Sequence, residues 1–176
     1  ARPGEAVIVS GTLCDHGMAI MNRRQNLGLE SSLVSDVAPL WGMIKAVLAE
    51  VPDIRCLRDP TRGGLAAALS DISGTSRCGI RIREQDIPVR REVQGACDIL
   101  GIDPLSVANE GKAVIVCPAD KADRVLAVLK RDPIGREARI IGQATREHPG
   151  MVVMETRAGG ERIVDLPTGE SLPRIC

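Results

Sequence analysis

The sequence predicts an α+β fold in which a mixed β-sheet carries helices mainly on one face. Three observations point to this class. Strand-like apolar runs alternate with helical spacing over residues 6–130, whereas strand-like runs follow one another over residues 139–164. Of the 176 residues 44% are hydrophobic, yet the chain has one Trp and no Tyr or Phe. The core must therefore be built from aliphatic side chains.

The elements are expected in the following order. Strands are predicted at residues 6–10, 54–58, 79–83, 112–117, 139–144, 151–154 and 162–164. Helices are predicted to start near residue 18 and to cover residues 37–50, 64–72, 88–100 and 119–130. Asp36 is the expected N-cap of the second helix, Pro88 suits the first turn of the fourth, and Gly159 with Gly160 suits a hairpin turn. The charged and apolar residues of 79–83 alternate, which predicts a half-exposed strand.

Charge and cysteine usage exclude several classes of protein. Lys+Arg and Asp+Glu are equal at 23 each, so no field favours nucleic acid or a membrane surface as a partner. The chain has no apolar run of membrane-spanning length. Its six cysteines form no C-x-x-C pair, so we expect no metal site and no redox dithiol. This pattern is typical of a reducing compartment and predicts a cytoplasmic protein.

The chain shows no internal repeat and no clear linker, so residues 1–168 are predicted to form one domain, followed by a flexible tail at 169–176. It opens at Ala1, directly before a strand and without an initiator Met, which suggests a piece of a longer protein. The tail ends in Pro-Arg-Ile-Cys. A thiol at a chain end is accessible, and Pro173 disfavours regular structure there. Cys176 is therefore either a frayed end or a reactive carrier.

A glycine-rich turn from strand to helix is predicted at residues 59–64, Asp-Pro-Thr-Arg-Gly-Gly. Backbone N–H groups at the start of a helix attract phosphate or carboxylate, and an arginine can clamp either one. The same residues also make an efficient turn, and the sequence alone leaves the two interpretations level. The candidate binding residues are Asp59, Thr61, Arg62, Gly63 and Gly64.

Two further stretches carry candidate chemistry. Asn109-Glu110-Gly111 precedes a buried strand: a glutamate there can act as a general base and an asparagine can orient a substrate, although such a tripeptide is often only a turn. Asp15 and His16 follow Cys14 directly. A nucleophilic Cys–His–Asp set is conceivable, but three consecutive side chains cannot converge on one point.

These stretches, with the terminal Pro-Arg-Ile-Cys, resemble the HypE family of hydrogenase maturation factors, in the superfamily of ATP-dependent aminoimidazole ribonucleotide synthetases. The resemblance covers residues 6–176, and the run 107–112 (VANEGK) carries it most closely. It implies that the chain is the C-terminal domain of a two-domain protein and has the fold of that domain. The family pattern has Gly where this chain has Cys14, and Cys tolerates a positive φ poorly.

The resemblance also implies a reaction. The Cys176 thiol would accept a carbamoyl group, which ATP-dependent dehydration converts to a thiocyanate, with Glu110 as the candidate base. The cyanide would then pass to the iron of a [NiFe]-hydrogenase centre. Asn109, Asp15 and His16, with the 59–64 turn, would bind substrate or phosphate. ATP and magnesium would be held mostly by an N-terminal domain absent from this chain, and this chain alone would be inactive.

The implied partners are a carbamoyltransferase, an iron-carrying scaffold complex of the same pathway, and a second copy of the full-length protein in a homodimer. Two alternatives stay open. The chain could be a non-catalytic docking module with an incidental thiol at Cys176. It could also belong to another synthetase or kinase branch of the superfamily, although those branches have no comparable reason to end in cysteine.

Overall fold

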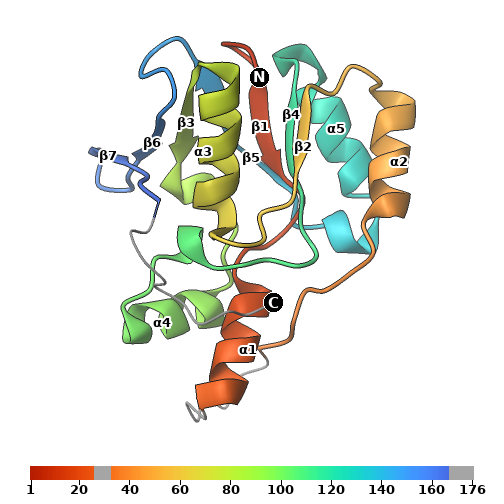
Figure 1. The fold of residues 1–176 in the computed structure, drawn as a ribbon. Coiled ribbons are helices and arrows are strands. Elements are labelled where there is room, and N and C mark those ends of the chain that lie inside the picture. Colours follow the sequence, from red (N-terminus) through yellow and green to blue (C-terminus); the bar gives the residue numbers. More distant parts are fainter. Residues whose placement is uncertain (26–32, 167–176) are drawn as a thin grey trace.

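A computed structural model describes residues 1–25 and 33–166, and its centre is a seven-stranded mixed sheet (Figure 1). The strands lie in the order β2-β4-β1-β5-β3-β6-β7. Every neighbouring pair is antiparallel except β3 and β6, which are parallel. Their bounds are β1 Ala6–Val9, β2 Cys56–Arg58, β3 Gly79–Arg83, β4 Val114–Cys117, β5 Arg139–Thr145, β6 Val152–Glu155 and β7 Glu161–Ile163. The α+β class and the mixed sheet are therefore confirmed.

Five α-helices accompany the sheet in the described residues, joined by short 3-10 turns. They are α1 Asp15–Gln25, α2 Trp41–Glu50, α3 Gly64–Ser76, α4 Arg91–Leu100 and α5 Ala122–Leu129. The 3-10 turns are η1 Glu84–Asp86, η2 Pro104–Ser106, η3 Ala119–Lys121 and η4 Pro133–Gly135.

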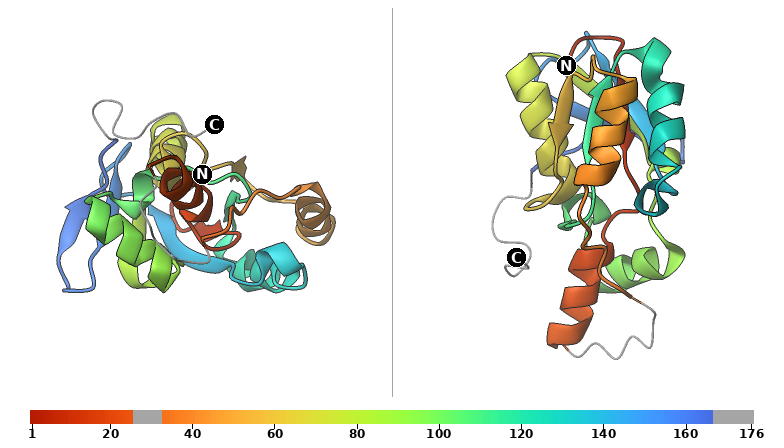
Figure 2. Two further views of the ribbon diagram at one scale, coloured as in Figure 1. Left: turned by 90° about the horizontal axis from the view of Figure 1, so that it is seen from below. Right: turned by 90° about the vertical axis from the view of Figure 1, so that its right-hand side faces the viewer.

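Aliphatic side chains form two buried clusters, one on each face of the sheet. Along β1, Val7 and Val9 belong to the first cluster and Ile8 to the second, as the alternation of a strand requires. Helices α1, α3 and α4 contribute to the first cluster, and α2 and α5 to the second. Figure 2 shows α3 and α5 on opposite sides of the sheet. The second helical layer departs from the expectation that helices lie mainly on one face.

Two helices begin later than predicted, each for its own reason. Helix α2 begins at Trp41, not at residue 37, because Pro39 disfavours helical geometry at the residue before it. Asp36 is consequently not an N-cap, and the position before α2 is Leu40. Helix α4 begins at Arg91, because residues 88–90 are extended: the carbonyl of Pro88 accepts a hydrogen bond from the N–H of Leu13.

The remaining sequence predictions fare as follows. Gly159 (φ +84°) makes the predicted turn, between β6 and β7. In β3 the isoleucines are buried and Arg83 is exposed, in line with the predicted alternation. Of the five described cysteines, four are buried and Cys56 is partly exposed. No helix in the described ranges is long and apolar enough to cross a membrane.

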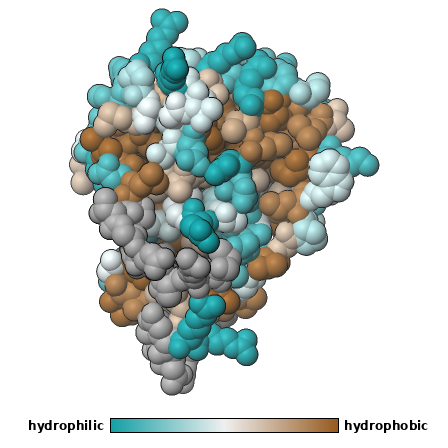
Figure 3. Space-filling view, viewed as in Figure 1, coloured by the Kyte–Doolittle hydropathy of each residue, from teal (hydrophilic) through white to brown (hydrophobic). Residues whose placement is uncertain are grey.

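Hydrophobic side chains also reach the surface at the β2 end of the sheet. On the face drawn in Figure 3, they gather over the region of β2 and α2, mixed with hydrophilic ones. Leu57 in β2 is 39% exposed and Trp41 at the start of α2 is 69% exposed. β2 is also an edge strand of only three residues, with Arg58 exposed beside Leu57, and short charged edges resist unwanted strand pairing.

Candidate functional site

The sheet topology brings the three predicted motifs to one edge. The pairing of Val9 with Val114 joins the end of β1 to the start of β4, and the pairing of Arg58 with Val114 joins the end of β2 to the same place. Residues 10–17 follow β1, residues 59–64 follow β2, and residues 109–112 precede β4. All three therefore lie at the lower end of the sheet in Figure 1, which we call the motif edge.

Asn109 ties these three stretches together. Its side chain accepts a hydrogen bond from the N–H of Cys14 (2.7 Å) and donates to the carbonyls of Pro60 and Val107 (3.0 Å each). The N–H of Asn109 also donates to Pro60 (3.1 Å), and the side chain is buried, with the residue only 1% exposed. Both polar atoms of the amide are thus occupied by backbone groups, so Asn109 fixes the relative positions of the three turns.

Glu110 lies beside this junction with an unused acceptor. Its Oε1 atom is buried and has no hydrogen-bond partner among the described residues. A buried carboxylate oxygen without a partner is costly, and such costs are tolerated chiefly where function needs them. The neighbouring Gly111 has no room for a side chain, because a Cβ there would lie 1.7 Å from the carbonyl oxygen of Asp36.

Asp15 and His16 begin α1, which lies below the motif edge in Figure 1. Asp15 is 2% exposed: Thr12 donates a short hydrogen bond to its Oδ2, and the Nε atom of Arg90 lies 3.6 Å from its Oδ1. Burial raises the pKa of the Asp15 carboxyl, and the Thr12 hydroxyl and Arg90 oppose that rise. His16 is 8% exposed, with Nδ1 2.9 Å from Ser35 Oγ, and its Nε2 is buried without a hydrogen-bond partner among the described residues.

Cys14 takes the positive φ expected where the family pattern has glycine. Its φ is +73°, and it is fully buried. The thiol donates to the carbonyl oxygen of Pro104 at 2.8 Å. Hydrogen bonding with Cys97, together with burial, raises the pKa of the Cys14 thiol. A buried thiol with a raised pKa is a poor nucleophile, so Cys14, Asp15 and His16 do not make a catalytic triad.

The turn at residues 59–64 is partly open and partly packed. Gly63 and Gly64 both have positive φ (76° and 62°), and the N–H of Gly64 donates to the carbonyl of Thr61 (2.9 Å). Thr61 also donates to Asp59 (3.1 Å). A Cβ on Gly64 would lie 2.5 Å from the carbonyl oxygen of Leu105, so this helix start is packed against η2.

The side chains of Asp59 and Arg62 belong to exposed residues on the same turn. They are the members of the turn that a phosphate group in solution can reach. Their role in binding phosphate stays a prediction.

Cys176 and the rest of the tail lie outside the described residues. Of the other predicted site residues, Asn109, Cys14 and the 59–64 turn are joined by hydrogen bonds, with Glu110 next to Asn109 in the chain. Asp15 and His16 have their hydrogen-bond partners elsewhere, on Thr12 and Ser35.

Three residues of this region were not predicted as site residues by the sequence analysis. Lys112 and Asp36 form an ion pair (2.8 Å) in which both side chains are 5% exposed, and Arg90 reaches Asp15. Lys112, with Asp36, Arg90 and Thr12, also lines a pocket of ≈ 290 Å³ beside the motif edge. Only Lys112 had a usable signal, because it follows the Asn-Glu-Gly run directly; Asp36 is 76 residues away in sequence.

The described residues include no group of three or more His, Cys, Asp or Glu side chains placed to hold a metal ion. Arg62 is the exposed cation of the 59–64 turn.

Comparison with known proteins identifies the family. The model for "AIR synthase related protein, C-terminal domain" matches residues 2–154. The carbamoyl dehydratase HypE of Azotobacter vinelandii is 49% identical over 176 residues, which cover 100% of this chain and 52% of that protein. The chain thus spans about half the length of the curated relatives it matches.

Solved structures agree with this match. HypE in complex with ATP superposes with a TM-score of 0.95 at 42% identity, covering 100% of this chain and 54% of that one. HypE in its complex with HypF gives 0.91 at 44% identity, covering 95% and 54%. Thiamine monophosphate kinase from Aquifex aeolicus, with 19% identity and a TM-score of 0.62, shares the fold alone. The chain therefore belongs to the AIR synthase related protein C-terminal domain family, as a homologue of HypE carbamoyl dehydratases.

Proposed function

We propose that this chain is the C-terminal half of a carbamoyl dehydratase that makes the cyanide ligand of a [NiFe]-hydrogenase. Residues 1–168 would form the domain and residues 169–176 the tail that carries the reacting sulfur. Relatives named carbamoyl dehydratase match the chain from end to end at about half identity, which supports the proposal. One observation of the structure carries it: at the edge where the three motifs meet, Glu110 keeps a buried oxygen without a partner.

The reaction begins with a carbamoyl group on the Cys176 sulfur, as a thiocarbamate. ATP supplies a phosphoryl group to the carbamoyl oxygen as the nitrogen loses one of its two protons, which turns a poor leaving group into a good one. Loss of phosphate and of the second N–H proton then leaves a C≡N triple bond, and the product is a thiocyanate on Cys176; the departing phosphate takes up one of the two protons. The sum is thiocarbamate plus ATP giving thiocyanate, ADP, phosphate and a proton, with no change of oxidation state.

The residues of this chain would bind and move the proton. Glu110 would accept the N–H proton, because its buried Oε1 has no competing donor. Asn109 would hold the turns around it, since its amide is already bonded to Cys14 and Pro60. Arg62, exposed on the 59–64 turn, would face the phosphate, with Asp59 and Thr61 shaping that turn. Asp15 and His16, at the start of α1, would bind substrate or phosphate.

The proposal also includes partner proteins and an N-terminal domain that lies outside this chain. A carbamoyltransferase would load Cys176, and the relative solved in complex with HypF supports a partner of this kind. The cyano group would pass to an iron-carrying scaffold complex, and the full-length protein would be a homodimer. ATP and magnesium would be held mostly by the half outside this chain, so residues 1–176 alone would neither bind nor hydrolyse ATP appreciably. Micromolar binding of Mg-ATP to this chain in a calorimetric titration would contradict that part.

The test of the proposal is peptide mapping of the full-length protein after reaction with the donor enzyme, carbamoyl phosphate and ATP. We expect the added mass on Cys176 alone. The described Cys14, Cys78, Cys97 and Cys117 are buried. Burial raises the pKa of Cys117 to about 11, so this thiol is almost fully protonated at neutral pH. Cys176→Ala should abolish loading without loss of stability, and Cys56→Ala is the control, since Cys56 is partly exposed.

Normal turnover in Cys176→Ala, or added mass on another cysteine, would overturn the proposal. No added mass on any cysteine and no turnover would favour a non-catalytic docking module. Loading that never occurs, together with ATP-dependent phosphorylation of a small molecule, would favour another synthetase or kinase branch of the superfamily.

A further inference from the structure

The ion pair between Lys112 and Asp36 is buried on both sides. The Nζ atom of Lys112 lies 2.8 Å from Oδ2 of Asp36, and both side chains are 5% exposed. The other ion pairs of residues 1–25 and 33–166 each include a side chain that is at least 28% exposed. Removing two charges from water is costly, and an apolar pair of the same volume is often as stable. The stability of the fold therefore gives little reason for this pair, whereas its position gives one.

The pair connects the residues around Glu110 to a segment far away in the sequence. Lys112 stands two residues after Glu110. Between them Gly111 lies against the backbone of Asp36, because a Cβ on Gly111 would be 1.7 Å from the carbonyl oxygen of Asp36 and 3.1 Å from the N–H nitrogen of Ala38. The segment 35–38 is thus packed directly on residues 110–112, without an intervening side chain.

Each side of this contact has an additional anchor. Ser35 Oγ lies 2.9 Å from His16 Nδ1 and accepts a hydrogen bond from the N–H of Val37 (3.2 Å), so the segment is also tied to the start of α1. On the other side, the Lys112 stem crosses the turn after β1, where its Cε atom would lie 2.9 Å from a Cβ on Gly11. The ion pair is the charged contact among those that join the segment 35–38 to Gly111 and Lys112, next to Glu110 in sequence.

The pair also determines where the positive charge near Glu110 sits. Lys112 has a flexible four-carbon stem and carries the ammonium group nearest to Glu110 in sequence. Asp36 binds that ammonium, and Glu110 Oε1 is left without a hydrogen-bond partner in the part of the chain that the structure describes. A carboxylate that is free of an ion pair is a better proton acceptor than one bound to an ammonium group.

We propose that Lys112 and Asp36 are positioning residues for Glu110: their ion pair fixes residues 110–112 under the segment 35–38 and keeps the ammonium of Lys112 off the Glu110 carboxylate. This inference rests on the proposed function, in which Glu110 accepts the proton during dehydration. In this proposal the pair acts only through Glu110.

A double-mutant cycle in the full-length protein tests this dependence. The variants are Asp36→Asn, Glu110→Gln and both together, and single-turnover mass spectrometry follows carbamoylation of Cys176 and its dehydration separately. Asp36→Asn should slow dehydration about 10- to 100-fold and leave carbamoylation unchanged, because misplacement of a reacting group by about 1 Å has such an effect. In the Glu110→Gln background the same change should slow dehydration less than about twofold, since nothing is left to position.

Two further variants guard against a simple folding defect. Asp36→Leu combined with Lys112→Met replaces the ion pair by an apolar pair that should fold, and dehydration should still be slow. Arg55→Met is the matched control, because Arg55 and Glu5 form an ion pair with the same 2.8 Å separation at the opposite end of the sheet. Dehydration in this variant should stay at the wild-type rate.

The possible results distinguish the positioning role of the ion pair from the proposed role of Glu110 as the base. Wild-type dehydration in Asp36→Asn, or equal slowing by Asp36→Asn in the presence and absence of Glu110, would overturn the positioning role while Glu110→Gln still slows the reaction. Wild-type dehydration in Glu110→Gln would overturn the proposed base, and the positioning role with it.

Discussion

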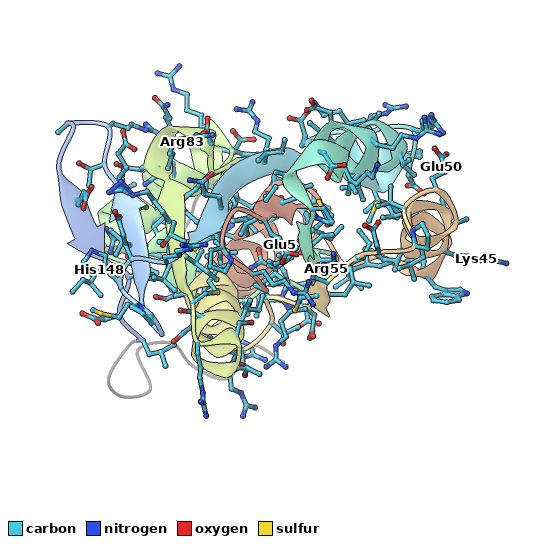
Figure 4. All side chains as sticks on the ribbon, turned by 90° about the horizontal axis from the view of Figure 1, so that it is seen from above. Glu5, Lys45, Glu50, Arg55, Arg83 and His148 are labelled. Carbon is cyan, nitrogen blue, oxygen red and sulfur yellow. The ribbon has the colours of Figure 1, made fainter. Side chains whose placement is uncertain are left out.

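Two glutamates at opposite ends of the central strands have opposite surroundings. Glu5 precedes β1, at the end where Ala6 pairs with Cys117, whereas Glu110 precedes β4, at the end where Val9 pairs with Val114. Glu5 is 7% exposed and both of its oxygens are bonded, Oε1 to Arg55 (2.8 Å) and Oε2 to the N–H of Arg2 (2.7 Å). Figure 4 shows Glu5 and Arg55 next to each other. Glu110 has a buried oxygen with no hydrogen-bond partner within residues 1–25 and 33–166.

Glu5 is a structural carboxylate whose oxygens are both bonded, whereas Glu110 keeps an oxygen available to accept a hydrogen bond or a proton. At the Glu5 end, an unpaired oxygen would only lower stability, and each oxygen has a donor. At the motif edge, the side chain of Asn109 joins the turns and Lys112 pairs with Asp36, while Glu110 Oε1, Asp36 Oδ1 and His16 Nε2 are buried without a hydrogen-bond partner among the described residues. The turns there are fixed by bonds among backbone groups and the Asn109 amide, so that unpaired polar atoms can remain for a substrate.

The largest expected effect on stability is that of Gly64→Ala. Gly64 has a φ of +62°, and a Cβ would lie 2.5 Å and 2.6 Å from the carbonyl oxygens of Leu105 and Val107. Backbone strain and overpacking together should lower the free energy of unfolding by about 3–5 kcal/mol. Gly4→Ala, at the Glu5 end, is the control: its φ is +91° but nothing lies within 4 Å, so the cost should be about 1–2 kcal/mol. Urea unfolding of both variants measures the difference, and equal costs would mean that the motif edge is not tightly packed.

Asn109→Ala should have the next largest effect. It removes the acceptor of the Cys14 N–H and the donor to the carbonyls of Pro60 and Val107, all in a buried place. Leaving such groups unpaired should lower the free energy of unfolding by about 2–4 kcal/mol. Hydrogen exchange should show faster opening of the turns at 10–17 and 59–64 than of β5. Uniform exchange across the protein would contradict the role of Asn109 as the link between turns.

Arg55→Met should cost less, about 1–2 kcal/mol, because it leaves Glu5 buried with one partner while Arg55 itself is 34% exposed. Thermal unfolding measures the loss. The variant should retain wild-type dehydration in the full-length protein, because the pair lies at the end of the sheet away from Glu110. Slow dehydration in this variant would mean that the two ends are coupled, and the contrast between them would be wrong.

The strands and the three motifs were predictable from sequence because each is a local pattern. Apolar runs located all seven strands to within a few residues, and the glycine-rich and Asn-Glu-Gly runs identified the turns of the motif edge. The helix at 37–50 was predicted four residues too long because its apolar spacing includes Val37, which is 65% exposed, whereas Pro39 was given too little weight.

Long-range contacts were not predictable. The ion pair of Asp36 with Lys112 depends on how the segment before α2 crosses residues 110–112, and no local pattern encodes that crossing. The role of Asn109 was predicted as substrate orientation, but its amide bonds with backbone groups of residues 14, 60 and 107 emerge only when β1, β2 and β4 are side by side.

Glu110→Gln should have the smallest effect on stability and a large effect on chemistry, and it tests the central claim most directly. Glutamine has the same shape, so the free energy of unfolding should change by about 0.5 kcal/mol or less. The full-length variant should accept carbamoyl on Cys176 at the wild-type rate and then stall, with dehydration slowed about 10²- to 10⁴-fold in single-turnover mass spectrometry. Accumulated thiocarbamate with intact folding is the predicted result. Thiocyanate formed at the wild-type rate would contradict the account.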